Sequence, residues 1–491
     1  MNNVISTIDR ERLSRQLEDA WRLTPATMGY KITKGQWIPA KHLLHISTIV
    51  ATQIAAGNAR IILTMPPRHG KSEFVSVNTP IWHLEKWPNR YVMQIAYGLE
   101  LATDFSLKVR ETFQNEDLHH LLRTRINPNK RKIDRFLTMQ GGGLTAAGVG
   151  GTITGRGGHL LTVDDYIKNA EAALSEAQRN SLWEWWLSTA WTRREPGCSV
   201  IILATRWHQD DLIGRVLTEQ AHENWTVINL PALAEENDPL GRAIGEPLWP
   251  ERYDLAELEN IKKGLGSYWW DAMYQQHPRP SMSGADLGGK LRIIDESEVP
   301  HHSQLKIVRV WDFAATEGGG DWTVGSKIAY HKASKRVYHL DTCRFRKSPS
   351  NTEIMVQTVA EHDGRGVKVW IEQEPGSSGK QVIEHYQTSV LRGYDVSGEK
   401  VTGPVEVRAQ PVLAAVEAGS YYAVKHPEVP NIVEELDAFP DGDHDDIITT
   451  MALGYYKLVR SKFGNVVWGR DAVEKVRIPN KTEGKRIGVV W

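Results

Sequence analysis

A short stretch near the start of the chain carries the residue types that bind phosphate. Residues 65–72 read Met-Pro-Pro-Arg-His-Gly-Lys-Ser and follow an apolar, strand-like run at 60–64. A strand, a tight turn, Gly-Lys-Ser and then a helix is the order of a phosphate-binding loop. Gly70 permits the unusual backbone that the loop needs, Lys71 can reach the β- and γ-phosphates, and the Ser72 hydroxyl can ligate Mg²⁺. The first glycine of the usual pattern is missing, so the alternative is an ordinary strand–turn–helix containing Gly-Lys-Ser by chance.

A second apolar run ends in two acids about 90 residues further on. Residues 159–165 read His-Leu-Leu-Thr-Val-Asp-Asp. In a phosphate-loop enzyme such a strand brings a carboxylate to the metal, so we predict that Asp164 holds Mg²⁺ together with Ser72. Asp165 stands where many of these enzymes carry the Glu that polarises the attacking water, and we predict that catalytic role for it. The alternative is a strand followed by an acidic helix cap.

Two further positions are candidates for nucleotide contacts. Residues 199–206 form another strand-like run, and Thr205 near its end suits a group that senses the γ-phosphate. Gln36 lies upstream of the phosphate loop beside Trp37, where it could contact an adenine. A buried Trp beside a turn explains the same pair equally well.

The second half of the chain places acids at the ends of separate elements. Asp312 ends a strand-like run, Glu372 ends another, and Asp445 with Asp446 opens a helical segment. In the expected β-β-β-α-β-α order the first and fourth strands can lie side by side, which would bring Asp312 and Glu372 together. Clustered carboxylates repel one another without cations, so the set predicts bound divalent metal. Two metals at such a cluster can cleave phosphodiesters, although each acid alone is explained by the preference of Asp for caps.

The elements that would position these residues divide the chain into five parts. A chain of 491 residues is too long for one ordinary core. We expect a helical arm or lid (1–58), a phosphate-loop core (59–215), a lid or linker subdomain (216–300), a second α/β domain (301–460) and a basic tail (461–491). Within the second domain we expect a strand at 405–408.

Composition excludes several classes of protein. The net charge is −1, so any surface that binds nucleic acid must be local. The two cysteines exclude a disulfide framework and suit a reducing cytoplasm. The sequence shows no signal-peptide pattern at its start and no apolar run of about 18 residues, so no membrane span is expected.

Taken together, the motifs resemble the large terminase subunit of tailed bacteriophages, the DNA-packaging ATPase and nuclease. Residues 65–73 are similar to that family's variant of the phosphate loop, and residues 163–169 and 204–207 resemble its metal-binding and coupling segments. Residues 372–380 and 439–446 resemble its nuclease motifs. The likeness spans roughly residues 35 to 460, and five motifs in this order are specific although each alone is weak.

The resemblance implies an α/β chain with an additional-strand P-loop NTPase domain followed by a ribonuclease H-like nuclease domain. ATP hydrolysis would drive double-stranded DNA into a procapsid, and the nuclease would cut concatemeric DNA. ATP and Mg²⁺ are the expected cofactors, with Mn²⁺ able to substitute at the nuclease site. The implied nucleotide-binding residues are Arg68, His69, Gly70, Lys71, Ser72, Thr205 and Gln36.

The same likeness implies further roles and partners. Arg156 is a candidate arginine finger acting on a neighbouring subunit, and Arg68 a candidate γ-phosphate contact; a surface salt bridge is the alternative for each. The catalytic set would be Asp165, Arg156, Asp312, Glu372 and Asp445. The metal ligands would be Ser72, Asp164, Asp312, Glu372, Asp445 and Asp446. Expected partners are double-stranded DNA, the portal protein, the small terminase subunit and further copies in a ring on the portal. A monomeric free form and a host cytoplasmic location, with transient docking on the procapsid and absence from the mature virion, complete the expectation.

Two other functions fit part of the pattern. A cellular helicase–nuclease of repair or defence would share the phosphate loop, but no clear set of further helicase motifs follows residue 165. A non-catalytic DNA or capsid scaffold with degenerate sites is disfavoured by the intact Lys71, Ser72 and Asp164.

Overall fold

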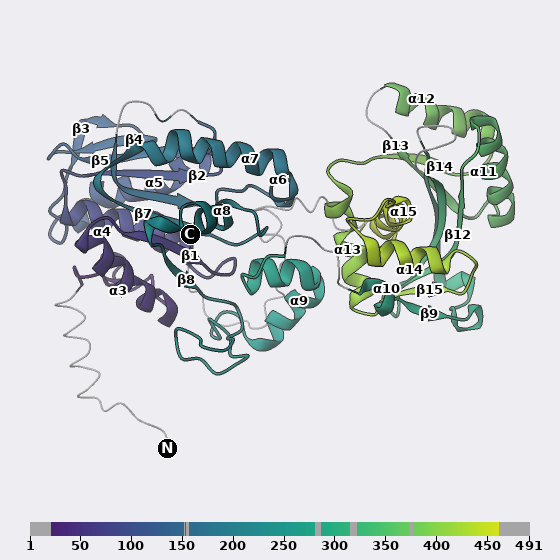
Figure 1. The fold of residues 1–491 in the computed structure, drawn as a ribbon, viewed down its shortest axis with the longest axis horizontal. Coiled ribbons are helices and arrows are strands. Elements are labelled where there is room, and N and C mark those ends of the chain that lie inside the picture. Colours follow the sequence, from purple (N-terminus) through teal and green to yellow (C-terminus); the bar gives the residue numbers. More distant parts are fainter. Residues whose placement is uncertain are drawn as a thin grey trace, which may run out of the picture.

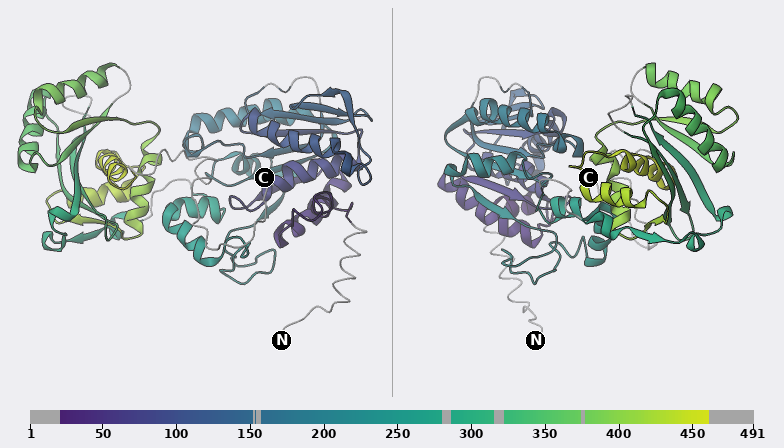
Figure 2. Two further views of the ribbon diagram at one scale, coloured as in Figure 1. Left: turned by 180° about the vertical axis from the view of Figure 1, so that it is seen from behind. Right: turned by 45° about the vertical axis from the view of Figure 1, so that its right-hand side comes forward.

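The computed structural model describes residues 21–151, 153, 157–279, 286–314, 322–373 and 377–460. Two lobes lie side by side (Figure 1), and the view from behind shows the same arrangement (Figure 2). We call residues 21–279 the N-terminal lobe and residues 286–460 the C-terminal lobe. Each lobe is built on one mixed β-sheet covered by helices, as the sequence predicted.

The N-terminal lobe contains an eight-stranded sheet in the order β3-β4-β5-β2-β6-β7-β1-β8. Its strands are β1 (Arg60–Thr64), β2 (Tyr91–Ala96), β3 (Ile126–Arg131), β4 (Arg135–Thr138), β5 (Gly143–Gly148), β6 (Gly158–Asp164), β7 (Arg194–Ala204) and β8 (Thr226–Asn229). The strands from β5 to β8 in this order are parallel, and β3 and β4 are antiparallel additions. Strand β7 lies between β1 and β6, which is the additional strand expected between the two phosphate-site strands.

Helices cover both faces of this sheet. They are α2 (Pro25–Ile32), α3 (Lys41–Ala56), α4 (Thr79–Lys86), α5 (Leu99–Gln114), α6 (Ala170–Leu174), α7 (Glu176–Trp185) and α8 (Leu212–Glu219). Helix α9 (Leu255–Trp269) lies away from the sheet, beside the C-terminal lobe (Figure 1). Alternate residues of β1 enter opposite cores: Ile61 and Leu63 pack with α3 and α5, whereas Ile62 packs with α7 and α8. A strand buried on both faces is uniformly apolar, which explains the sequence of β1.

The C-terminal lobe contains a seven-stranded sheet in the order β14-β13-β10-β11-β12-β15-β9. Its strands are β9 (Arg292–Ile294), β10 (Leu305–Asp312), β11 (Thr323–His331), β12 (Arg336–Phe345), β13 (Lys368–Gln373), β14 (Val396–Lys400) and β15 (Tyr421–Val424). Strands β10, β11 and β12 form an antiparallel meander, and β13 pairs in parallel with β10. The predicted neighbours therefore lie side by side.

The helices of this lobe are α10 (Leu287–Lys290), α11 (Pro349–Asp363), α12 (Ser377–His385), α13 (Val405–Glu417), α14 (Val429–Ala438) and α15 (Asp446–Tyr455). The predicted strand at 405–408 is wrong, because these residues form the first turn of α13. The alternation Val-Glu-Val-Arg imitates a strand locally, but the following residues include Ala, Gln and Leu, which favour helix. The strand of this region is β14, a few residues earlier.

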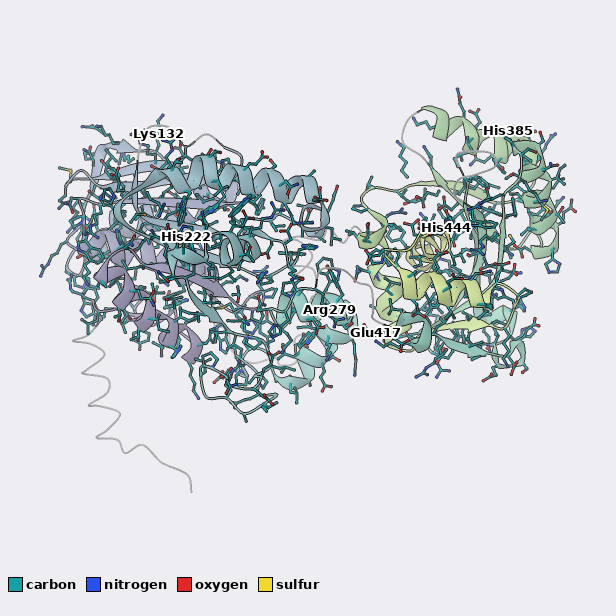
Figure 3. All side chains as sticks on the ribbon, viewed as in Figure 1. Lys132, His222, Arg279, His385, Glu417 and His444 are labelled. Carbon is teal, nitrogen blue, oxygen red and sulfur yellow. The ribbon has the colours of Figure 1, made fainter. Side chains whose placement is uncertain are left out.

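The lobes touch through α9 and α13. The backbone N–H of Ser267 donates to Glu417 Oε2 at 2.7 Å, and Lys290 Nζ donates to Glu417 Oε1 at 3.0 Å. Figure 3 labels Glu417 at this junction. Tyr268 and Trp269 of the N-terminal lobe pack in the same apolar cluster as Val412 of α13. Among the described helices, none combines the length and the apolar character that crossing a bilayer requires.

Candidate active sites

The first site is the loop that joins β1 to the π-helical segment Glu73–Asn78. Gly70 has a φ of 84°, in the region that favours glycine, and a Cβ there would lie 2.9 Å from Leu43. Lys71 is only 6% exposed, and its Nζ donates to the Pro66 carbonyl at 3.4 Å. Its ammonium group is thus held over the loop, where a phosphate would be received.

The end of β6 lies against this loop. Ser72 Oγ donates to Asp164 Oδ1 at 3.3 Å, and Ser76 Oγ donates to Asp164 Oδ2 at 2.7 Å. Burial and the neighbouring Asp165 raise the pKa of Asp164 to about 7, although the two serines and Lys71 oppose that rise. An oxygen-only pair of Ser hydroxyl and buried carboxylate, placed beside a lysine, fits Mg²⁺ held with a nucleotide phosphate.

The end of β7 lies beside the same loop. Thr205 is buried, and its Oγ1 donates to the Met65 carbonyl at 3.4 Å. Asp165 follows β6 with a φ of 47°, and its backbone carbonyl accepts from Tyr97 N–H at 3.0 Å. Thr205 is therefore adjacent to the loop, and Asp165 directly follows the carboxylate that accepts from Ser72.

Of the two predicted loop contacts Arg68 and His69, the first lies on the turn and the second is buried beneath it. Arg68 also has a positive φ, 61°, and stands on the turn before Gly70. His69 is fully buried: its Nδ1 donates to the Pro67 carbonyl at 2.8 Å, and its ring stacks on Tyr253 at 5.0 Å. Burial lowers the pKa of His69 to about 3, so the ring is neutral. His69 thus supports the loop from within the protein.

Among the described residues of the N-terminal lobe, no hydrogen bond or ion pair joins Gln36 to the loop. Gln36 is exposed on the turn after α2, while its neighbour Trp37 packs against the core beneath α3. The adenine contact of Gln36 stays a prediction. Arg156 lies outside the described residues.

The second site lies in the C-terminal lobe, at the carboxyl ends of β10 and β13. Asp312 ends β10, Glu372 lies near the end of β13, Asp445 precedes α15 and Asp446 is its first residue. Burial raises the pKa of Asp312 well above its usual range, and the charges of Glu372, Asp446 and Asp445 raise it further. The structure therefore brings together all four acids that the sequence singled out.

An arginine compensates part of this negative charge. Arg408 of α13 donates to Glu372 Oε2 at 3.1 Å, although burial still raises the pKa of that carboxyl. Within the described residues, no three His, Cys, Asp or Glu side chains are already arranged around one metal position. The donor set nevertheless consists of carboxylates that repel one another, and this chemistry suits Mg²⁺ or Mn²⁺.

Three residues of these sites escaped the sequence reasoning. Ser76 lies four residues after Ser72 on the same helical face, a spacing that could have revealed it. Arg408 could not be found, because its segment was interpreted as a strand. Glu435 of α14 accepts the Ile448 N–H at 2.8 Å and so holds the start of α15 from a neighbouring helix, a tertiary contact without local signal.

Two family models match this chain, one in each lobe. The family model described as "Terminase large subunit, T4likevirus-type, N-terminal" matches residues 62–272, and the model described as "Terminase RNaseH-like domain" matches residues 309–458. Each covers one of the two sites described above. No curated protein is recognisably similar in sequence.

Several solved structures align with this chain. The large terminase of a thermophilic bacteriophage, in its complex with ADP, is 11% identical, with a TM-score of 0.45 over 84% of this chain and 96% of that one. The HK97 bacteriophage large terminase is 10% identical, with a TM-score of 0.35 over 84% and 95%. The P22 large terminase nuclease domain is 12% identical, with a TM-score of 0.29 over 40% and 98%.

Proposed function

Because this chain belongs to the large terminase subunit family, the ATPases and nucleases of viral DNA packaging, we propose which of its residues perform each reaction. The division of labour follows the two lobes. We assign residues 59–215 to the ATPase core, 301–460 to the nuclease, 1–58 to a lid or arm, 216–300 to a linking subdomain and 461–491 to a basic tail.

In the N-terminal lobe, ATP is the proposed nucleotide. Gly70 and the loop amides receive the phosphates, and the Lys71 ammonium neutralises the β- and γ-phosphates. Ser72 and Asp164 hold Mg²⁺, which when bound stabilises the charge that develops on the transferred phosphoryl group. Asp165 orients the attacking water. Thr205, at the end of β7, senses whether the γ-phosphate is present. Arg68 and the buried His69 fix the shape of the loop. Gln36 as an adenine contact and Arg156 as a finger toward a neighbouring subunit complete the proposal.

In the C-terminal lobe, Asp312, Glu372, Asp445 and Asp446 are the proposed ligands of Mg²⁺ or Mn²⁺. Bound divalent metal supplies a nucleophilic water and stabilises the leaving oxygen of the phosphodiester. The protein's part is to hold four carboxylates from three elements within one small volume. Arg408 offsets part of their negative charge through its hydrogen bond to Glu372.

The observation that carries the ATPase assignment is the pair of hydrogen bonds from Ser72 and Ser76 to the buried Asp164. These bonds join the phosphate loop, which follows β1, to the end of β6. In the sheet, the additional strand β7 lies between β1 and β6. The family matches do not favour the alternative of a cellular helicase–nuclease.

The proposed partners are double-stranded DNA, the portal protein of the procapsid, the small terminase subunit and further copies of the chain in a ring on the portal. The proposed location is the host cytoplasm, with transient docking on the procapsid. ATP-dependent uptake of DNA into purified procapsids, with this chain added, tests the set. Uptake that is equal without the chain or without ATP would refute it.

The ATPase centre is tested by Lys71→Ala. We expect ATP hydrolysis to fall by at least about 100-fold, because the charge that stabilises the transition state is lost. Lys132→Ala is the matched control, since Lys132 is an exposed lysine on the same lobe (Figure 3). Equal hydrolysis rates for the Lys71 variant and the wild type would remove the assignment.

The nuclease centre is tested by Asp312→Ala in plasmid cleavage with Mg²⁺ or Mn²⁺. We expect loss of cleavage with ATP hydrolysis retained, because the two sites lie in different lobes. Asp395→Ala is the control, since Asp395 is a largely exposed acid of the same lobe. Normal cutting by the Asp312 variant would show that the nuclease centre is elsewhere.

A further inference from the structure

Beside the four acids, two arginines meet one tryptophan ring. The guanidinium carbon of Arg346 lies 4.1 Å from the Trp322 ring centroid, and that of Arg344 lies 4.4 Å from it. Arg344 belongs to β12, Arg346 follows it, and Trp322 comes just before β11. We call Trp322, Arg344 and Arg346 the basic rim.

The basic rim is in direct contact with the nuclease acids. The backbone N–H of Trp322 donates to Asp446 Oδ2 at 3.3 Å. His444 lies between the same two groups: its Nε2 is 3.4 Å from Arg346 Nη2, and its Nδ1 is 3.8 Å from Asp446 Oδ2, beyond hydrogen-bond distance. Figure 3 labels His444 beside α15. A strand of nucleic acid that crosses the acids would therefore pass over the basic rim within a few ångströms.

The positive charges of the basic rim are only partly balanced by a neighbouring carboxylate. Two guanidinium groups on one ring repel each other, and a cation–π contact at an exposed site offsets this by only about 0.5–1 kcal/mol each. Arg344 faces Glu428 at 3.6 Å, too long for a hydrogen bond, and Arg346 is exposed. An anion placed between the two arginines would relieve the repulsion.

The basic rim also presents an unused donor. Trp322 Nε1 is shielded from water and has no hydrogen-bond partner among the described residues. A buried N–H without an acceptor is costly. The two guanidinium groups above the ring offer the planar donors that bind phosphate oxygens.

We propose that the basic rim binds a backbone phosphate of the DNA. This phosphate is the neighbour, along the same strand, of the phosphate that is cut. This proposal rests on the nuclease centre proposed above and adds the residues that seat its substrate. Arg344 and Arg346 hold a phosphate and fix the register of the strand, while metal held by the four acids would act on the neighbouring, scissile phosphate. Phosphate contacts position a nucleic acid without reading its sequence, so the basic rim supplies affinity and placement but no base preference.

The test measures cleavage of a duplex oligonucleotide by the full chain, with KM and kcat determined at several salt concentrations. For Arg346→Ala we expect KM to rise about ten-fold, as the loss of one charge-assisted hydrogen bond predicts. The plot of log(kcat/KM) against log[salt] should become shallower by about one, because one phosphate contact fewer releases fewer counterions. Arg346→Lys keeps the charge and should restore the salt slope while recovering only part of the affinity.

Arg365→Ala is the matched control. Arg365 is an exposed arginine of the same lobe near an aromatic ring, 5.9 Å from Tyr394, and it precedes β13 at the end opposite Glu372. Its KM and salt slope should equal those of the wild type. Calorimetric titration with Mn²⁺ alone should give the same affinity for Arg346→Ala and wild type, since a DNA contact is not a metal ligand.

The outcomes separate this inference from the proposed function. If Asp312→Ala still cuts the oligonucleotide, the nuclease centre itself is misplaced. If Asp312→Ala is inactive and Arg346→Ala keeps the wild-type KM and salt slope, the basic rim is refuted while the nuclease centre stands. A loss of Mn²⁺ affinity in Arg346→Ala would also overturn the proposal, because the arginine would then act through the acids.

Discussion

Ser76 offers the sharpest test of how the ATPase site is assembled. Its Oγ donates to Asp164 Oδ2 at 2.7 Å, and both residues are fully buried. In Ser76→Ala this carboxylate oxygen loses its hydrogen bond in a place that water does not reach. A hydrogen bond to a charged group contributes about 1.5–3 kcal/mol, and loss of a partner that orients a metal ligand lowers metal affinity about 10–100-fold. We therefore expect the Mg²⁺ concentration that gives half-maximal ATP hydrolysis to rise by that factor.

The assay is steady-state ATP hydrolysis against Mg²⁺ concentration, with ATP held above its KM. Ser106→Ala is a closely matched control, because Ser106 is also a fully buried serine whose hydroxyl donates a short hydrogen bond, to the Ile133 carbonyl at 2.6 Å. Ser76→Ala should lose about 1.5–3 kcal/mol of stability and Ser106→Ala about 1 kcal/mol, but only the Ser76 variant should shift the Mg²⁺ curve. Superimposable curves for Ser76→Ala and Ser106→Ala would refute the idea that Ser76 orients Asp164.

Three further changes have definite expected results. Arg309 is 1% exposed and donates to Asp363 at 2.7 and 2.9 Å, so Asp363→Ala removes its main counter-charge. We expect the free energy of unfolding of the C-terminal lobe, measured with denaturant, to fall by about 3–5 kcal/mol. Asp395→Ala should change it little. Burial lowers the pKa of His339 to about 3, so its contribution to stability is intact above pH 6.5 and is lost as pH falls toward 3, by about 1.4 kcal/mol per pH unit. In His339→Gln the free energy of unfolding should therefore depend less steeply on pH, by that amount. An unchanged slope would contradict a lowered pKa for His339. Glu435→Leu removes the acceptor for the Ile448 N–H and should weaken Mn²⁺ binding in calorimetry about ten-fold. Glu435→Gln keeps an acceptor oxygen and should bind Mn²⁺ nearly as the wild type does. Equal affinities in both variants would exclude a role for Glu435 in positioning the start of α15.

The sequence predicted those parts of both sites that lie at strand ends. Asp164 ends an apolar run that is typical of a buried strand, and Asp312 and Glu372 end two more. Because parallel strands end at the same edge of a sheet, the order of such runs was enough to predict that Asp312 and Glu372 meet, and the pairing of β10 with β13 confirms it. Predictions of this kind succeed because periodicity and chain order carry the information.

The residues that tune these sites were beyond the reach of sequence alone. Glu435 acts from α14 on the backbone of α15, and Arg408 reaches Glu372 from a helix whose first four residues alternate like a strand. Neither contact leaves a local pattern, since both depend on how helices pack across a sheet. Tertiary packing overrides local propensity at such places, and there the structure is needed.

Helix α13 contacts both the proposed nuclease acids and the N-terminal lobe. Arg408 near its start donates to Glu372, and Glu417 at its end accepts the Ser267 N–H from α9. Nine residues of helix span about 13.5 Å, so these two contacts lie on one short helix. Pro411 lies between them and removes one hydrogen bond from the helix interior. The packing that places α13 therefore positions an arginine beside the acids and a glutamate at the junction of the lobes, which no local pattern in the sequence could indicate.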